Sequence, residues 1–320
     1  RKTIPPAETV LPSNLCPLIK SSIGYVITNG CPFFSMADLV VAETTCDGKK
    51  KVWELIRDRK PQHILELTQK VEEPEAWEHW LAEVRKLKIR LEELYDNHVT
   101  DEAMGGAIRA MNRERALLRR IMEYGAEPRP LISGLELGRL RYRVSGMPGH
   151  LAALEELARV LEDRRAGGVF AAPEAAPRVL VTGCPMSEGT LKAVEVIEEA
   201  GGVVVVQETC SGIKPLDPVE EQGDPLTAIA RKHFRIPCSC MTPNRGRLEL
   251  LKDLAERFRA DAVVDVVWQA CHTYNVESYS AGAFVRDRLG LPYLKVETDY
   301  SPGNREQLMV RVQTLLEMAR

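Results

Sequence analysis

Cysteines are the residues of this chain with the most evident chemical potential. None forms a Cys-x-x-Cys pair, the short spacing that zinc ribbons and thioredoxin-type redox motifs need. With 320 residues, the chain is too long and too poor in cysteine for a secreted disulfide scaffold. In the reducing cytoplasm, where we expect the protein, such thiols are candidates for metal binding, catalysis or simple burial. The eight are Cys16, Cys31, Cys46, Cys184, Cys210, Cys238, Cys240 and Cys271.

Six of these cysteines fall at predicted loops. Cys184, Cys210 and Cys271 each end a predicted buried strand, and loops at that edge of a parallel sheet converge on one crevice. Thiolates dispersed over several loops suit an iron–sulfur cluster better than zinc, because a cluster is large enough to be held from several sides. Predicted helices follow Cys46 and Cys184, and their free N–H groups stabilise negative charge. The other three, at fifteen-residue intervals, are Cys16, Cys31 and Cys46.

The remaining two cysteines form the sequence Cys238-Ser239-Cys240. Thiols at positions i and i+2 can both be metal ligands, but they can equally be core residues of a turn. His63 and His272 are further potential ligands, although a lone histidine is more often a hydrogen-bonded structural residue.

Three residues shortly after Cys271 have side chains that can transfer protons. We predict His272, Tyr274 and Glu277 as proton donors, because a neutral histidine is suited to proton transfer near pH 7 and the other two also titrate. The alternative is that all three are supporting residues at the start of a helix.

The elements that position these residues form two α/β lobes. In residues 1–73, Val26–Thr28, Ala37–Glu43 and His63–Leu67 are predicted strands, and residues 46–59 a helix. Because the chain begins at Arg1 rather than Met, we expect this lobe to lack part of its start. Residues 178–320 alternate Val-rich strands with helices, so we predict doubly wound, flavodoxin- or Rossmann-like parallel sheets.

A helical insertion separates the lobes. Residues 74–166 carry apolar side chains at three- and four-residue spacing among many Glu, Lys and Arg, which predicts amphipathic helices acting as a cap or dimerisation arm. We predict a homodimer, because Trp77 and Trp80 lie in this apolar stripe; the rival is that the stripe packs inside its own subunit. Residues 167–177, rich in small residues and proline, form a linker.

Composition excludes several partners. The formal net charge of −3 gives no basic field for nucleic acid, and no apolar run approaches the ~18 residues of a membrane span. Hydrophobic residues make up 44% of the chain, enough for sizeable cores.

At this point the motifs resemble a known family. NLCPLIKSSIG (Asn14–Gly24), ADLVVAETTCDGKKKVWELI (Ala37–Ile56) and WQACHTYNVES (Trp268–Ser278) are similar to the three cluster-cysteine motifs of 2-hydroxyacyl-CoA dehydratase subunits. The segment from Gly290 to Met318 resembles the C-terminal block of the same family. The resemblance implies one 4Fe-4S cluster held by Cys16, Cys46 and Cys271.

Additional cysteines distinguish this chain from the dehydratase pattern. Cys31 in GCPFF, Cys184 in VTGCP and Cys210 in ETCSGIKPL make the set resemble the double-cubane branch of the family. That branch holds an 8Fe-9S cofactor on six cysteines, which implies these three as the second triplet, with Cys238 as a substitute for one member.

The resemblance also implies a partner and an activity. Members of this superfamily receive low-potential electrons from a separate ATP-hydrolysing iron–sulfur protein, and no Gly-x-x-x-x-Gly-Lys-Ser/Thr loop occurs in the 320 residues. Three functions follow: a cytoplasmic, oxygen-sensitive reductase of small unsaturated molecules, a dehydratase subunit in which one electron makes a ketyl radical and water leaves, or a non-catalytic electron carrier. The six loop cysteines favour the first.

Overall fold

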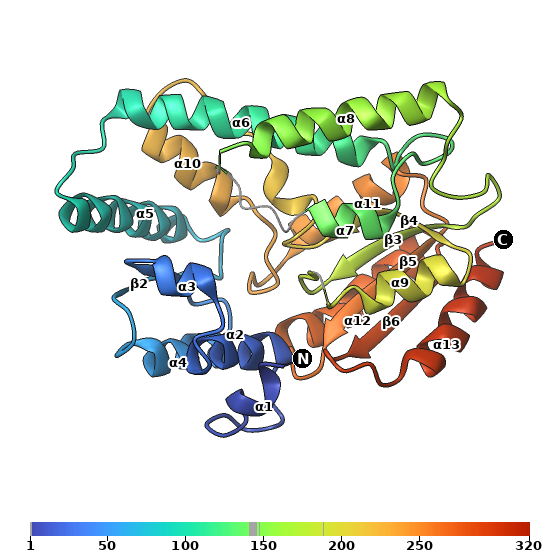
Figure 1. Ribbon diagram of the computed structural model, residues 1–320, viewed down its shortest axis with the longest axis horizontal. Coiled ribbons are helices and arrows are strands. Elements are labelled where there is room, and N and C mark those ends of the chain that lie inside the picture. The colour runs from blue at the N-terminus through green and yellow to red at the C-terminus, as the bar shows by residue number, and fades with distance from the viewer. Residues whose placement is uncertain (1, 141–145, 147, 188) are drawn as a thin grey trace. The chain divides into compact units, whose positions relative to one another are not determined.

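The computed structural model describes residues 2–140, 146, 148–187 and 189–320 (Figure 1). It comprises two compact units, each assembled from segments that are distant in sequence. Their limits therefore differ from the sequence domains 1–73, 74–166 and 178–320, and the linker 167–177 lies within the second unit. Unit 1 contains Arg1–Ile108, Val219–Asn244 and Trp268–Thr273; unit 2 contains Arg109–Pro218, Arg245–Val267 and Tyr274–Arg320.

Unit 1 contains a two-stranded parallel sheet. Strands β1 (Val40–Glu43) and β2 (Gln62–Leu65) pair with Val40 opposite Gln62, and helix α4 (Asp47–Ile56) connects them. We predicted that Val52, Leu55 and Ile56 share its buried face; the helix buries Val52 and Ile56, whereas Leu55 is exposed. The α/β character of this part of the chain is confirmed.

The segment before β1 is helical where we predicted a strand. Val26–Thr28 was predicted as a strand, but Val26 lies in α2 (Pro17–Ile27). The reason is a longer helical pattern: Pro17 suits the first turn, and Ile19, Ile23 and Val26 recur at helical spacing on the buried side. The neighbouring helices are α1 (Ile4–Ala7) and α3 (Pro32–Met36).

The two tryptophans of the predicted helical arm pack inside unit 1. They lie on α5 (Pro74–Tyr95), which contacts α10 (Pro225–Phe234). The indole N–H of Trp80 donates to the Ala230 carbonyl at 2.9 Å, and Trp77 meets Phe234 edge to face at 5.5 Å between ring centroids. Both aromatic rings that motivated the dimer thus have partners within the chain, and the homodimer stays a prediction. The next helix is α6 (Asp101–Glu123).

Unit 2 is built on a four-stranded sheet in the order β4-β3-β5-β6. Strand β3 pairs in parallel with both β4 and β5, which confirms the predicted fold class. The strand order reverses between β3 and β5, and ligands of such sheets bind beyond the carboxyl ends of the strands at this point. The strands are β3 (Arg178–Gly183), β4 (Val203–Glu208), β5 (Ala262–Trp268) and β6 (Tyr293–Thr298).

Helices surround this sheet (Figure 1). The helix that we predicted from Ser187 begins later, at Lys192; before it, the Thr190 amide donates to the Ser187 carbonyl at 2.8 Å. Among the described residues no helix combines the length and apolar character that crossing a membrane requires. The helical elements are α7 (Gly134–Leu140), α8 (His150–Ala166), α9 (Lys192–Glu199), the 3-10 turn η1 (Lys214–Leu216), α11 (Arg245–Arg257), α12 (His272–Arg288) and α13 (Arg305–Met318).

The Trp80 anchor yields a stability prediction. Trp80→Phe removes the hydrogen bond to Ala230 and leaves a void, so we expect a loss of about 2 kcal/mol in the free energy of unfolding. Urea denaturation followed by circular dichroism measures it. Trp77→Phe is the matched control, because phenylalanine retains an edge contact with Phe234 and should cost less. Equal losses in both variants would contradict the anchoring role of Trp80.

Candidate functional site

Four cysteines of unit 1 stand at the starts of helices, and three of them are the cysteines of the dehydratase pattern. Cys16 is the N-cap residue of α2, and Cys46 is the N-cap residue of α4. The Cys46 thiol accepts the backbone N–H of Lys49 at 3.4 Å. Cys271 directly precedes α12. Each thiol is therefore placed where free N–H groups and the helix dipole favour negative charge.

These three thiols lie close enough to influence one another's protonation. The pKa of Cys16 is raised to about 11: burial is the largest cause, Cys271 and Cys46 add to it, and the amides of Leu18 and Ile19 oppose it. Burial also raises the pKa of Cys46, with Cys271 adding to the effect and the Lys49 amide opposing it. The structure thus brings together Cys16, Cys46 and Cys271, the triad that the dehydratase resemblance implied.

The triad has the chemistry of a cluster site. Among the described residues, no three His, Cys, Asp or Glu side chains gather around one metal ion, so the three thiols interact at a longer range than the donors of a mononuclear site. An iron–sulfur cluster binds each thiolate at a different iron, and its negative charge suits the surrounding helix starts. The donor set present therefore fits such a cluster.

Cys31 occupies a different local setting from the one expected. It does not end a strand, because it lies between α2 and α3 and is the N-cap residue of α3. Its thiol accepts the Phe34 amide at 3.4 Å. The end of α3 is held by Lys60, whose ammonium donates to the carbonyls of Ser35 and Ala37 at 3.1 and 2.7 Å.

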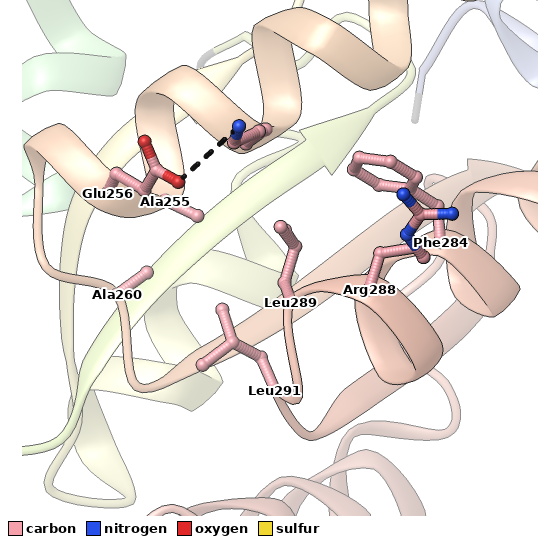
Figure 2. A pocket seen from close by; sticks show the side chains of 8 residues that line it. Ala255, Glu256, Ala260, Phe284, Arg288, Leu289 and Leu291 are labelled. Atoms are coloured by element: carbon pink, nitrogen blue, oxygen red, sulfur yellow. Dashed lines mark ion pairs between the residues drawn. The ribbon is translucent and has the colours of Figure 1, made fainter.

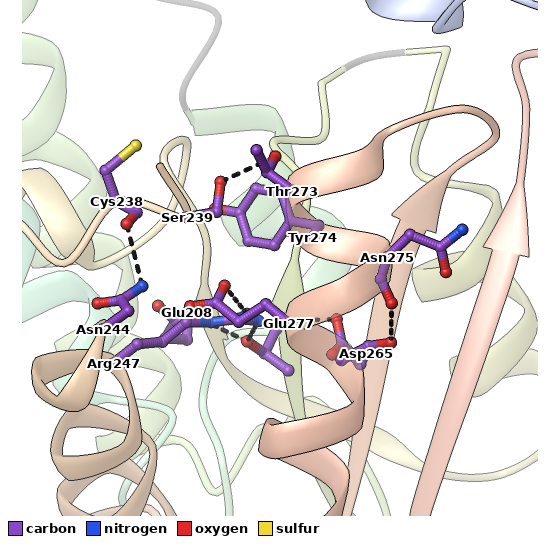
Figure 3. Close-up of polar contacts among 12 residues, drawn as sticks. Glu208, Cys238, Ser239, Asn244, Arg247, Asp265, Thr273, Tyr274, Asn275 and Glu277 are labelled. Carbon is purple, nitrogen blue, oxygen red and sulfur yellow. Dashed lines mark hydrogen bonds and ion pairs between the residues drawn. The ribbon is translucent and has the colours of Figure 1, made fainter. Parts of the chain in front are cut away.

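The Cys238–Cys240 turn also belongs to unit 1 and adjoins the loop of Cys271. The Ser239 hydroxyl donates to the Thr273 hydroxyl at 3.3 Å, and Thr273 Oγ1 lies 3.7 Å from Cys271 Sγ (Figure 3). Cys240 is buried, whereas Cys238 is partly exposed.

Unit 2 holds the other two cysteines, on adjacent loops. Cys184 follows β3 directly and is only 1% exposed, and Cys210 lies two residues beyond β4 and is exposed. Ser211 joins the loops, because its hydroxyl donates to the Met186 carbonyl at 2.7 Å and accepts the Met186 amide at 3.1 Å. The helix that we predicted from Ser187 begins at Lys192, so in the described part of this segment the first helical residue lies eight positions after Cys184.

Tyr274 is the predicted proton donor that the structure places beside a cysteine. Its hydroxyl lies 3.8 Å from Cys210 Sγ and accepts from the Lys214 ammonium at 3.3 Å. Lys214 in turn forms an ion pair with Glu208 at 2.7 Å, with both side chains inaccessible to solvent. Two cations lie over the tyrosine ring: Lys214 Nζ at 5.5 Å and the Arg247 guanidinium at 4.9 Å from its centroid.

Arg247 is the centre of a buried ionic network (Figure 3). It lies 3.5 Å from Glu208 and 3.7 Å from Asp265, and it also pairs with Glu277. Burial would lower the pKa of the guanidinium, but the surrounding carboxylates outweigh it and raise that pKa above its ordinary value. Burial raises the pKa of Asp265, although Arg247 opposes this effect.

The predicted histidine and glutamate have less direct positions. Glu277 forms an ion pair with Arg247, so its carboxylate is part of the buried ionic network. His272 is the exposed first residue of α12. His63 lies in β2, where burial lowers the pKa of its imidazole below the ordinary value.

Sequence reasoning missed Glu208, Lys214 and Arg247. Glu208 and Lys214 flank Cys210 in ETCSGIKPL, so the signal was two opposite charges around a predicted strand end. Arg247 gave no such signal, because charged residues at the start of a helix are ordinarily solvated.

A cavity of about 390 Å³ lies elsewhere in unit 2, between α11 and α12 (Figure 2). Ala260 and Leu291 in its wall lie two residues before the starts of β5 and β6, so the cavity is at the amino-terminal edge of the sheet. Ligands of doubly wound sheets bind at the opposite edge, where Cys184 and Cys210 lie.

Fold and site together define an α/β protein whose thiols occupy helix starts and strand ends. A family model described as 2-hydroxyglutaryl-CoA dehydratase, D-component, matches residues 1–319, and the chain belongs to this family. "Putative dehydratase subunit YjiM" of Escherichia coli (strain K12) is 41% identical over 322 residues, covering 99% of this chain and 83% of that protein. "Lactoyl-CoA dehydratase subunit beta" of Anaerotignum propionicum is 22% identical over 325 residues, with the same two coverages.

The protonation of Cys16 gives a test of the site in metal-free protein. With a pKa of about 11, roughly 0.1% of this thiol is ionised at pH 8, and its burial limits access further. We expect iodoacetamide to modify Cys16 far more slowly than the exposed Cys210, as followed by peptide mass spectrometry. Raising the pH toward 11 should accelerate the alkylation of Cys16, because a larger fraction of its thiol is then ionised. Similar rates for both thiols at pH 8 would refute the described environment.

Proposed function

We propose that this protein is an iron–sulfur reductase of the dehydratase family, which accepts electrons from an ATP-hydrolysing partner and reduces small unsaturated molecules. The observation that carries the proposal is the mutual influence of Cys16, Cys46 and Cys271, each at a helix start. Three thiols in such a setting support an anionic iron–sulfur cofactor.

The additional cysteines support an 8Fe-9S double-cubane cofactor over a single 4Fe-4S cluster. Cys184 and Cys210 follow two paired strands, at the edge of the sheet where ligands bind. With Cys31, the sequence supplies six candidate ligands, the number that a double cubane requires. When bound, such a cofactor supplies low-potential electrons one at a time.

The chain's own residues would bind and orient the cofactor and supply protons to the substrate. Tyr274 is held between Cys210 and Lys214, so its hydroxyl can donate a hydrogen bond to the thiolate or a proton to a substrate at this edge. Lys214 and Arg247 keep two positive charges against the ring. The Arg247 network fixes their positions, because Glu208 contacts both cations.

The negative charge of the proposed cofactor is the argument for a separate partner protein. Thiolates around a sulfide-rich cofactor make an anionic centre, and adding an electron to it is unfavourable. No phosphate-binding loop of the Walker type occurs in the 320 residues, so the driving force is assigned to a separate ATP-hydrolysing iron–sulfur protein. Docking coupled to hydrolysis would favour the electron-accepting state.

The second candidate is a dehydratase subunit with one 4Fe-4S cluster. It is favoured by the two relatives, both named as dehydratase subunits, and by the triad, which alone suffices for one cubane. An electron carrier without catalysis is the third candidate, and the two tests below separate all three.

Iron content distinguishes the cofactors. Anaerobically purified protein should contain about eight irons per chain, because six thiols are available for two cubanes. Iron and acid-labile sulfide are quantified together with the electron paramagnetic resonance spectrum. A count of about four would favour the dehydratase subunit. Zinc in place of iron would exclude both assignments.

Electron delivery distinguishes a gated reductase from a carrier. Turnover of a small unsaturated substrate should require the ATP-hydrolysing partner and ATP together, because a common low-potential donor alone does not supply the driving force. The assay compares the complete mixture with mixtures that lack ATP or the partner. A non-hydrolysable ATP analogue is the control for binding alone. Equal turnover in all mixtures would support a plain electron carrier.

A further inference from the structure

We propose that Lys20 is a positioning residue for Cys16, the first member of the cysteine triad; this inference rests on the proposed function and concerns how one ligand of its cofactor is held. The contacts of Lys20 within unit 1 carry the argument. They join helix α2, which follows Cys16, to the residues that precede it, Thr3–Leu15, which we call the strap.

Lys20 holds the chain on both sides of Cys16. Its backbone N–H donates to the Cys16 carbonyl at 3.0 Å, the bond with which α2 begins. Its side chain extends back toward the strap, where the ammonium donates to the Ser13 carbonyl at 2.8 Å and to the Glu8 carboxylate at 2.7 Å. One residue therefore fixes the backbone at Cys16 itself and at a point three residues earlier.

The Lys20 ammonium acts by holding the strap rather than by its charge. Lys20 is only 7% exposed, and a buried ammonium is unfavourable unless an opposite charge is nearby. Glu8 supplies that charge, so the pair as a whole is neutral. Without the ammonium, the Ser13 carbonyl and the Glu8 carboxylate would both lose this partner. The segment next to Cys16 would then lose its attachment to α2.

The other end of the strap is attached to α2 independently. Helix α1 lies against α2 (Figure 1). A Cβ atom at Gly24 would lie only 1.8 Å from the Thr3 carbonyl oxygen, so a glycine is required for this close approach. The hydroxyl oxygens of Thr3 and Ser21 are 3.0 Å apart. Loss of the Lys20 contacts should therefore free the part of the strap next to Cys16 and leave the rest in place.

The position of Cys16 matters because α2 begins beside α4. The side chains of Leu15 and Ile19 meet α4 at Gly48, where a Cβ atom would lie 3.2 and 2.9 Å from their Cδ1 atoms. Gly48 is two residues after Cys46, the N-cap residue of α4. Residues on both sides of Cys16 thus pack against the start of the helix that carries Cys46. A fixed strap keeps these two thiols of the triad together.

The first test measures alkylation of the metal-free full chain. Lys20→Met removes the ammonium and keeps an unbranched side chain, so we expect iodoacetamide to modify Cys16 about tenfold faster than in wild type. Cys240 is the internal control, because both thiols belong to unit 1 and are 6% exposed. Peptide mass spectrometry follows both sites in one sample. Equal acceleration of the two thiols, or none at Cys16, would overturn the inference.

Three further variants separate a local effect from general destabilisation. Lys20→Arg should restore slow modification of Cys16, because a guanidinium can also donate to a carbonyl and a carboxylate. Glu8→Ala should accelerate it by a smaller factor, since the Ser13 contact remains, and it replaces Lys20→Met if that variant does not fold. Lys192→Met is the matched control in unit 2, where another buried lysine donates to backbone carbonyls. Faster modification of Cys16 in this control would contradict a local role of Lys20.

The same variants test the loaded protein. After purification without oxygen, the electron paramagnetic resonance spectrum of Lys20→Met should differ from that of wild type, because a displaced thiolate changes the environment of its iron. The Lys20→Arg spectrum should match wild type. An unchanged spectrum in Lys20→Met would overturn the inference. A wild type without iron would overturn the proposed function instead, and alkylation of the metal-free protein would still decide whether Lys20 positions Cys16.

Discussion

Negative charge on a buried thiol is stable only where the protein compensates it, and this constraint explains where the cysteines of unit 1 lie. Cys16 and Cys46 are N-cap residues, and amides of the following turns oppose the rise that burial causes in their pKa values. These amides offset only part of the effect of burial, because the pKa values of both thiols remain above their ordinary value in the metal-free protein. A helix must therefore begin at the right residue, and the small β1-α4-β2 sheet fixes one such start.

In unit 2, buried charges are compensated by charged side chains rather than by backbone amides. Arg247 and Lys214 are buried, and the carboxylates of Glu208, Asp265 and Glu277 neutralise them. Buried ion pairs add little net stability, because desolvation offsets most of the attraction, but breaking one leaves an unpaired charge. Their value here is positional: the network joins β4, β5 and α12 around the Tyr274 ring.

The sequence predicted the parts whose local pattern and tertiary role agree. The Val-rich strands of unit 2 were recognisable because a strand covered on both faces is apolar throughout, and Cys46-Asp47 marked a helix start. Local pattern failed at Val26, since a short β-branched run does not reveal the helix to which it belongs. It also could not show that Trp80 meets Ala230, or that Ser239 meets Thr273, because these contacts join residues far apart in the chain.

The composition of unit 1 from three separate stretches of chain has a consequence for biosynthesis. Cys16 and Cys46 leave the ribosome more than two hundred residues before Cys271. During that interval the emerging chain carries two of these thiols without the third. A cofactor that requires all three, as we propose, can therefore bind only after Cys271 has been synthesised.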